Sequence, residues 1–254
     1  MIVTPALEII SLRKIYKNGV TALNGIDLRV EDGDFFALLG PNGAGKSTVI
    51  GIISSLVNKT SGTVRIKGID IQKDFQKAKS FLGVVPQEFN FNVFETPWQI
   101  LVNQAGYYGI PRKVAETRVE KYLSQMGLWS KRDDRARELS GGMKRRLIIA
   151  RSLVHEPRLL ILDEPTAGLD MVAQSNIIKL LNDLRRTHDL SYLIVSHDLA
   201  VIAELCEWVG VMKTGKLTDT LLSKHLVTRR QNLAPYTRKL VDAASNYVTT
   251  NLGT

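Results

Sequence analysis

A glycine-rich segment constrains the fold of this chain more than any other feature. Gly40-Pro41-Asn42-Gly43-Ala44-Gly45-Lys46-Ser47 matches the pattern G-x-x-x-x-G-K-[ST]. The apolar run from Phe35 to Leu39 precedes it, and the apolar residues of a helix follow from Val49 to Leu56. A strand, a glycine-rich loop and a helix in this order predict an α/β fold in which N–H groups at a helix N-terminus hold phosphate oxygens.

The residue types in this loop indicate how a nucleotide would be bound. Lys46 carries a charge for the β- and γ-phosphates, and the Ser47 hydroxyl is a ligand for Mg²⁺. A mere strand-to-helix turn is the alternative, but a chance match in a chain of 254 residues has odds of roughly one in a hundred. We expect nucleotide contacts from Asn42, Gly43, Ala44, Gly45, Lys46, Ser47 and Thr48.

Two acidic residues end a second apolar run. Leu159-Leu160-Ile161-Leu162 reads as a buried strand, and Asp163-Glu164 follows it directly. Ligands of open α/β sheets bind at the carboxyl ends of the strands. We expect Asp163 to hold Mg²⁺, directly or through water, and Glu164 to orient and deprotonate the attacking water. The alternative is that both acids are helix caps or surface charges.

The chain divides into a β-rich first third and a helical middle. Between Leu7 and Val30, turn signals at Asn18-Gly19 and Asn24-Gly25 predict short antiparallel strands. From Glu95 to Glu138 the pattern is helical, with prolines near helix starts. The run from Tyr192 to Val195 follows a helical stretch at 172–186, which is the rhythm of a parallel sheet.

These patterns predict an α/β fold with a mostly parallel core sheet, an N-terminal antiparallel β subdomain and an inserted α-helical subdomain at about 88–139. We expect the domain to span residues 1–222. A polar, basic tail at 223–254 follows, with a weakly amphipathic stretch from Arg238 to Ala244.

The composition limits where the chain can be located and which partners it can bind. No apolar stretch approaches the roughly 18 residues of a membrane span, and the N-terminus lacks a signal-peptide pattern. The single cysteine, Cys206, fits a reducing cytosol and is expected to pack as a small apolar residue. The net charge of +9 would suit nucleic acid, anionic lipid or nucleotide phosphates. A solvated basic surface is the alternative. Basic clusters such as Lys144-Arg145-Arg146 and Arg229-Arg230 are short and lack interleaved aromatics, so the charge alone does not decide the partner, and no nucleic acid is expected.

A third segment indicates a family. Leu139-Ser140-Gly141-Gly142-Met143 precedes an apolar-periodic helix, with Ser140 as its N-cap. With the phosphate loop and Asp163-Glu164 in this order, it resembles the signature motif of ABC ATPases, and the resemblance covers nearly the whole chain. Met143 stands where many members have glutamine, but the serine and both glycines are intact.

The resemblance implies a P-loop NTPase (RecA-like) core that binds and hydrolyses ATP with Mg²⁺. It also implies a head-to-tail dimer with a second ABC ATPase subunit, identical or different, in which Ser140, Gly141 and Gly142 complete the other subunit's site. The dimer would drive transmembrane permease subunits. The chain would then be cytoplasmic and peripheral at the inner face of the cell membrane.

Four further residues gain roles from this resemblance. Tyr16 would stack on adenine, although it could equally pack on a sheet. Gln87 would reach Mg²⁺ and respond to the membrane partner; a plain polar loop residue is the alternative. Asp170, in Ala167-Gly168-Leu169-Asp170, resembles the D-loop residue that contacts the other subunit's phosphate loop, or it caps a helix. His197 matches the switch histidine that would hold the γ-phosphate and the attacking water.

The segment after Gln87 is rich in aromatic residues. Phe89, Phe91, Phe94 and Trp98 lie where family members receive a coupling helix from the membrane subunit. Exposed aromatics would form a socket for that helix, whereas buried ones would be the core of the helical insertion. Two exposed members of this group would imply a partner.

Two other functions share the phosphate loop and the signature. A soluble ABC ATPase of ribosomes or DNA usually carries a second ATPase domain or a long coiled coil, and 254 residues leave no room for either. A hybrid that binds ATP without turnover is opposed by intact Lys46, Glu164 and His197.

The two parts of the chain resemble different branches of the family. Residues 1–170 look most like ATPases of drug and antibiotic exporters, and residues 171–254 like those of peptide and nickel importers. The importer likeness is carried by 170–174, 196–201 and Pro235-Tyr236-Thr237-Arg238, although Ala234 stands where a histidine usually precedes Pro-Tyr-Thr. The direction of transport and the cargo are therefore left open.

Overall fold

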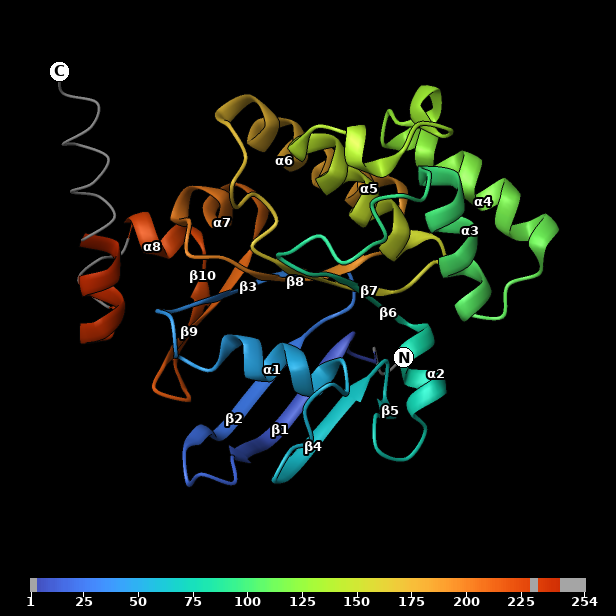
Figure 1. The fold of residues 1–254 in the computed structure, drawn as a ribbon. Coiled ribbons are helices and arrows are strands. Elements are labelled where there is room, and N and C mark those ends of the chain that lie inside the picture. Colours follow the sequence, from blue (N-terminus) through green and yellow to red (C-terminus); the bar gives the residue numbers. More distant parts are fainter. Residues whose placement is uncertain (1–3, 229–232, 243–254) are drawn as a thin grey trace, which may run out of the picture.

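The strand before the phosphate loop lies in the middle of the main sheet. The computed structural model describes residues 4–228 and 233–242, and Figure 1 shows two sheets with one helix between them. The main sheet has the order β10-β9-β3-β8-β7-β6 and is parallel except for β10. Its strands are β3 (Phe35–Leu39), β6 (Leu82–Val85), β7 (Leu159–Asp163), β8 (Ser191–Val195), β9 (Trp208–Lys213) and β10 (Lys216–Leu222).

Helices cover both faces of this sheet, which is why its central strands are apolar throughout. Along β3, Phe35, Ala37 and Leu39 join one core cluster, and Phe36 and Leu38 join the other. Helix α1 (Lys46–Ile53) packs on the second face. The first face is covered by α5 (Gly141–Leu153), α6 (Met171–Thr187) and α7 (Leu199–Leu205) (Figure 1).

The N-terminal antiparallel subdomain is a four-stranded sheet. Its order is β2-β1-β4-β5, built from β1 (Leu7–Ile15), β2 (Thr21–Val30), β4 (Ser61–Ile66) and β5 (Ile69–Asp70). The turn predicted at Asn18-Gly19 is confirmed, since Gly19 N donates to Tyr16 O at 2.9 Å. The turn predicted at Asn24-Gly25 is wrong. Strand β2 continues through it, and Gly25, with φ of 76°, lies where the register with β1 shifts.

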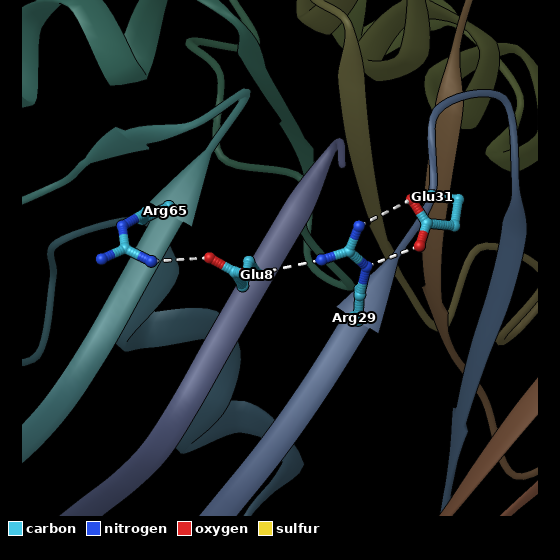
Figure 2. Close-up of polar contacts among 4 residues, drawn as sticks. All are labelled: Glu8, Arg29, Glu31 and Arg65. Atoms are coloured by element: carbon cyan, nitrogen blue, oxygen red, sulfur yellow. Dashed lines mark hydrogen bonds and ion pairs between the residues drawn. The ribbon is translucent and has the colours of Figure 1, made fainter. Parts of the chain in front are cut away.

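A ladder of charges crosses the exposed face of this sheet (Figure 2). Glu8 on β1 lies opposite Arg29 on β2 and Arg65 on β4, and it pairs with them at 3.2 Å and 2.7 Å. Arg29 also binds Glu31 through Nε at 2.5 Å. Cross-strand charge pairs of this kind contribute about 0.2–1 kcal/mol each and favour one register.

The predicted helical insertion is present and lies at one end of the molecule beside α5 (Figure 1). It contains α3 (Pro97–Tyr107), α4 (Arg112–Gln125) and the 3₁₀ turns Trp129–Lys131 and Ala136–Glu138. Thr96 and Gln99 form a capping box at the start of α3, with Pro97 as its first residue. A short helix, α2 (Phe75–Ser80), precedes β6.

The described part of the tail packs onto the domain. Helix α8 (Lys224–Thr228) follows β10, and a further helix spans 235–242. Leu226, Leu233 and Val241 are buried in the same core cluster as β3 and α6. The predicted amphipathic stretch is therefore helical as far as 242, whereas residues 243 and 244 and the Arg229-Arg230 cluster lie outside the described residues.

Within residues 4–228 and 233–242, the structure has no helix that combines the length and the apolar composition of a bilayer crossing. Cys206 is 4% exposed and packs in the core, as predicted.

Candidate nucleotide-binding site

The phosphate loop needs its glycines for steric reasons. Gly45 is the N-cap of α1 with φ of 106°, and a Cβ there would lie 2.7 Å from the carbonyl oxygen of Ala22. A Cβ at Gly40 would lie 2.4 Å from the carbonyl oxygen of Met212. Side chains at both positions are excluded, so the loop backbone stays close to β2 and β9.

Lys46 is the first residue of α1 and is 8% exposed. Its Nζ donates to the carbonyl oxygens of Gly40 at 2.5 Å and Pro41 at 3.0 Å. Burial lowers the pKa of the Lys46 ammonium, and the charges of Glu164 and Asp163 partly offset this. The loop therefore holds a partly desolvated cation against two acids.

The predicted residues meet in one cleft of about 390 Å³. Nine of those predicted to bind nucleotide, metal or water line it: Asn42, Gly43, Gly45, Lys46, Ser47, Thr48, Gln87, Asp163 and Glu164. Val20, Thr21, Ala22 and Val195 complete the wall. Ala44 is buried behind the loop.

Tyr16 lies beside the cleft, at the end of β1. It is 38% exposed, and its hydroxyl is 3.4 Å from Thr48 Oγ1. Lys14 Nζ lies 4.8 Å from the centre of its ring. The ring is thus attached to the phosphate-loop helix instead of being enclosed in the sheet.

The acids occupy the carboxyl end of β7. Burial and the charge of Glu164 raise the pKa of the Asp163 carboxyl, while Lys46 and Arg145 act in the opposite direction. Neither acid caps a helix of the described chain, so the capping alternative is wrong. An oxygen-rich set of Ser47, Gln87 and Asp163 in one cleft has the ligand chemistry that Mg²⁺ prefers.

Glu164 is held by the neighbouring strand β8. Its φ is 47°, and its N–H donates to Val195 O at 2.8 Å. The Ser196 hydroxyl donates to Oε2 at 3.2 Å, and His197 Nδ1 lies 2.8 Å from Oε1. The Glu164 side chain is 13% exposed and that of His197 is 76% exposed. The predicted base and the predicted switch histidine are directly linked, and Ser196 joins them although no motif pointed to it.

Seven predicted residues do not line the cleft. Three of them, Tyr16, Ala44 and His197, adjoin residues that do, and we call the other four, Ser140, Gly141, Gly142 and Asp170, the signature set. Ser140 caps α5 as predicted, accepting from Met143 N at 3.3 Å. Asp170 caps α6, accepting from Ala173 N at 2.8 Å. A Cβ at Gly142 would lie 3.4 Å from Ala173 Cβ, so the starts of the two helices are adjacent.

The aromatic segment after Gln87 divides into two pairs. Phe91 and Trp98 pack against the core. Phe89 and Phe94 are 40% and 62% exposed. Both alternatives for this segment therefore hold in part, and the condition of two exposed aromatics is met.

Comparisons with known proteins agree with this geometry. Residues 23–167 match the family model described as ABC transporter. The chain is 36% identical over 239 residues to the methionine import ATP-binding protein MetN of Helicobacter acinonychis, with 88% of this chain and 72% of that protein covered. It is also 36% identical over 211 residues to the linearmycin resistance ATP-binding protein LnrL of Bacillus subtilis, with 83% and 67% covered.

Solved structures give the same result. CbiO1 of Clostridium perfringens, part of the ABC transporter complex CbiONQ, superposes with a TM-score of 0.81 at 30% identity, with 98% of each chain covered. The ATP-binding cassette MJ1267 shares the fold, with a TM-score of 0.78 at 24% identity over 93% of this chain and 98% of that chain. The likeness to both an importer and a resistance ATPase confirms that the chain resembles both branches of the family. Each match spans most of the chain, so the division near residue 170 stays a prediction. The chain therefore belongs to the ABC transporter family, as an ATP-binding ATPase subunit that drives a membrane partner.

Proposed function

We propose that the chain hydrolyses MgATP in the Gly40–Ser47 cleft as one half of a head-to-tail dimer. The observation that carries this proposal is the separation of the predicted residues into a cleft and a signature set. A second subunit in the opposite orientation would bring its own signature set to the mouth of this cleft. The Ser140 helix start supplies N–H groups and a dipole suited to a phosphate.

Different residues of the cleft and its edge would bind different parts of MgATP. The Tyr16 ring offers a face to adenine, the loop N–H groups hold the phosphates, and Lys46 adds a charge. Ser47, Gln87 and Asp163 would hold Mg²⁺, which when bound neutralises part of the phosphate charge. Asp170 would contact the other subunit's phosphate loop.

Glu164 and His197 carry the chemistry in this proposal. Water attacks the γ-phosphorus, the bond to the β-phosphate oxygen breaks, and Glu164 takes the proton of the water. Ser196 and His197 each contact one Glu164 oxygen, and the lone pairs left on these oxygens can accept the water. His197, which is exposed, would hold the γ-phosphate.

The proposed contact with the permease lies beyond Gln87. Phe89 and Phe94 are exposed, and Asn90, the residue after Phe89, lines a second cleft of about 350 Å³ together with Tyr108. Leu56, 84% exposed, also lines this cleft and adds apolar surface. We propose that a coupling helix of a transmembrane permease subunit docks here. The chain is then peripheral at the cytoplasmic face of the membrane, with the ATPase domain at 1–222, its helical insertion at about 88–139 and the tail at 223–254.

The test measures ATPase rate against protein concentration for the chain and for Glu164→Gln, with Glu116→Gln as the control on exposed α4. We expect the ATPase rate of the wild-type chain to rise faster than linearly with protein concentration, because the active form is a dimer. Glu164→Gln should slow hydrolysis by about 10²- to 10⁴-fold and should elute as a dimer when MgATP is present. Normal turnover in Glu164→Gln, or a strictly linear rate with no dimer, would refute the proposal.

A further inference from the structure

A buried arginine connects the signature helix to the loop that carries Gln87. Arg145, on α5, is 2% exposed, and its guanidinium is among the largest fully buried groups of the described chain. Nη1 donates to Pro86 O and Nη2 to Gln87 O, both at 2.8 Å. This is a planar fork that grips two successive carbonyl groups.

Within the described part of the chain, the positive charge of Arg145 is not neutralised by an ion pair. Among residues 4–228 and 233–242, no carboxylate lies within ion-pair distance of its guanidinium, and its Nε is buried with no hydrogen-bond partner. Phe89 covers the group, with its ring centre 5.2 Å from Cζ. Burial lowers the pKa of the Arg145 guanidinium, and the charge of Asp163 acts in the opposite direction. Burying such a cation costs several kcal/mol, so an apolar side chain would serve a purely structural role at least as well.

The same loop is attached to α5 a second time. Arg151 Nη1 donates to Asn90 O at 3.1 Å, and its Nη2 donates to Asn90 Oδ1. Both ends of the segment 86–90 are thus fixed to one helix, and Gln87, which belongs to this segment, lines the cleft.

We propose that Arg145 is a positioning residue of the nucleotide site, which fixes the backbone of Gln87 at the wall of the cleft. This inference rests on the proposed function, because Gln87 is one of the three residues proposed to hold Mg²⁺. Arg145 touches neither nucleotide nor metal in this proposal. It acts by holding this metal ligand in place.

The test compares Arg145→Met, which removes the donors and the charge, with Arg145→Lys, which keeps the charge but loses the fork. Arg146→Met is the matched control, because Arg146 lies next on α5 and donates to Met126 O at 2.8 Å, away from the cleft. Hydrogen exchange of residues 86–90 in the full chain without nucleotide reports the loop. Titration calorimetry of ATP, with Mg²⁺ and with a chelator, reports the metal site.

For Arg145→Met we expect faster exchange at 86–90 and a loss of about 10- to 100-fold in the gain of ATP affinity that Mg²⁺ provides. Affinity in the chelator should change by less than about twofold, since the phosphate loop is untouched. Arg145→Lys should also show faster exchange at 86–90 and a reduced Mg²⁺ effect, because a lysine ammonium lacks the planar fork that holds two carbonyl groups. Arg146→Met should leave both measurements at the wild-type level.

Two results would overturn the inference. The first is a folded Arg145→Met protein whose hydrogen exchange at 86–90 and whose Mg²⁺ effect on ATP affinity both equal those of the wild type. The second is the same pair of results for Arg145→Lys, and this variant decides the question if Arg145→Met does not fold. Lys46→Ala and Gln87→Ala in the same titrations separate the proposals. If Lys46→Ala and Gln87→Ala leave the binding of ATP and Mg²⁺ unchanged, the assignment of the nucleotide site fails. If these two variants weaken binding and the Arg145 variants do not, only the role of Arg145 fails.

Discussion

His197 Nδ1 lies 2.8 Å from Glu164 Oε1, and this contact joins the residues that follow two neighbouring parallel strands. The exposed imidazole thus holds a carboxylate that is almost entirely enclosed. If Glu164 is the base, the same histidine fixes the orientation of that base.

His197→Ala tests this relationship. We expect ATP affinity to stay near that of the wild type, because the phosphate loop and Tyr16 are unchanged. Turnover should fall by about 10²-fold or more, the usual worth of a group that assists proton transfer. His188→Ala is the control, since His188 lies 3.3 Å from Gln125 in a different cleft. A steady-state assay showing equal turnover in the two variants would contradict the assignment of His197.

Asp163→Asn should make the protein without nucleotide more stable while removing the effect of Mg²⁺ on ATP binding. Burial and the charge of Glu164 raise the pKa of the Asp163 carboxyl, so the fold disfavours its ionised form. The unfolded chain then ionises first, and wild-type stability falls as pH rises from the ordinary pKa of 3.8 through the raised one. Thermal unfolding should therefore show an advantage for the asparagine variant near pH 7 that shrinks toward pH 4. An advantage that does not depend on pH would contradict this electrostatic cause.

We expect the protein to lose stability in mild acid because of His155. Its ring stacks on Tyr108 at 3.7 Å, Nε2 lies 2.9 Å from Leu82 O, and burial lowers its pKa to about 4. The unfolded chain takes up a proton near the ordinary pKa of 6.5, and the folded chain does so only near 4. Stability from this residue is therefore complete above about pH 6.5 and is lost progressively by pH 4, by about 3 kcal/mol in all.

Urea unfolding of wild type and His155→Phe between about pH 7 and pH 4.5 measures this effect. The phenylalanine keeps the aromatic stack but cannot titrate, so its stability should fall less steeply with acid even if it starts lower at neutral pH. Parallel curves for the two proteins would show that another group causes the acid sensitivity.

The Glu8 ladder should stabilise the antiparallel sheet modestly and in a salt-dependent way. Glu8→Gln removes the charge that Arg29 and Arg65 share (Figure 2). We expect a loss of about 0.5–1 kcal/mol in the free energy of unfolding at low salt, and a smaller loss in 1 M salt. Urea unfolding at both ionic strengths measures it, with Glu116→Gln on α4 as the control for an exposed helical pair. A loss unaffected by salt would point to packing instead of charge.

The sequence predicted those parts of the site that depend on local order along the chain. A strand, a loop and a helix at Phe35–Ile53 place Lys46 and Ser47, and the acids follow directly from the end of β7. Such motifs are readable because backbone geometry alone positions their side chains. The hairpin of β9 and β10 was not predicted, although Thr214 and Gly215 have the positive φ of a tight turn and the glycine is a local signal for it.

The rest depends on contacts between distant segments. Asn24-Gly25 has a strong turn signal, yet β2 continues because pairing with β1 extends across it, with a bulge as the compromise. Lys144-Arg145-Arg146 looks like a basic surface cluster, and nothing in the three letters indicates that the middle one is buried. Arg145 meets Pro86 and Gln87 about sixty positions away, a distance that periodicity cannot cover.

Ser140 caps helix α5, and Arg145, five residues later on the same helix, holds Gln87. In a head-to-tail dimer Ser140 would serve the ATP of the other subunit, and Arg145 would serve the ATP of its own subunit. A shift of the helix caused by one nucleotide would then alter the fit of the other. The two sites would fill cooperatively, and a dimer with one disabled site would report that defect at the intact one.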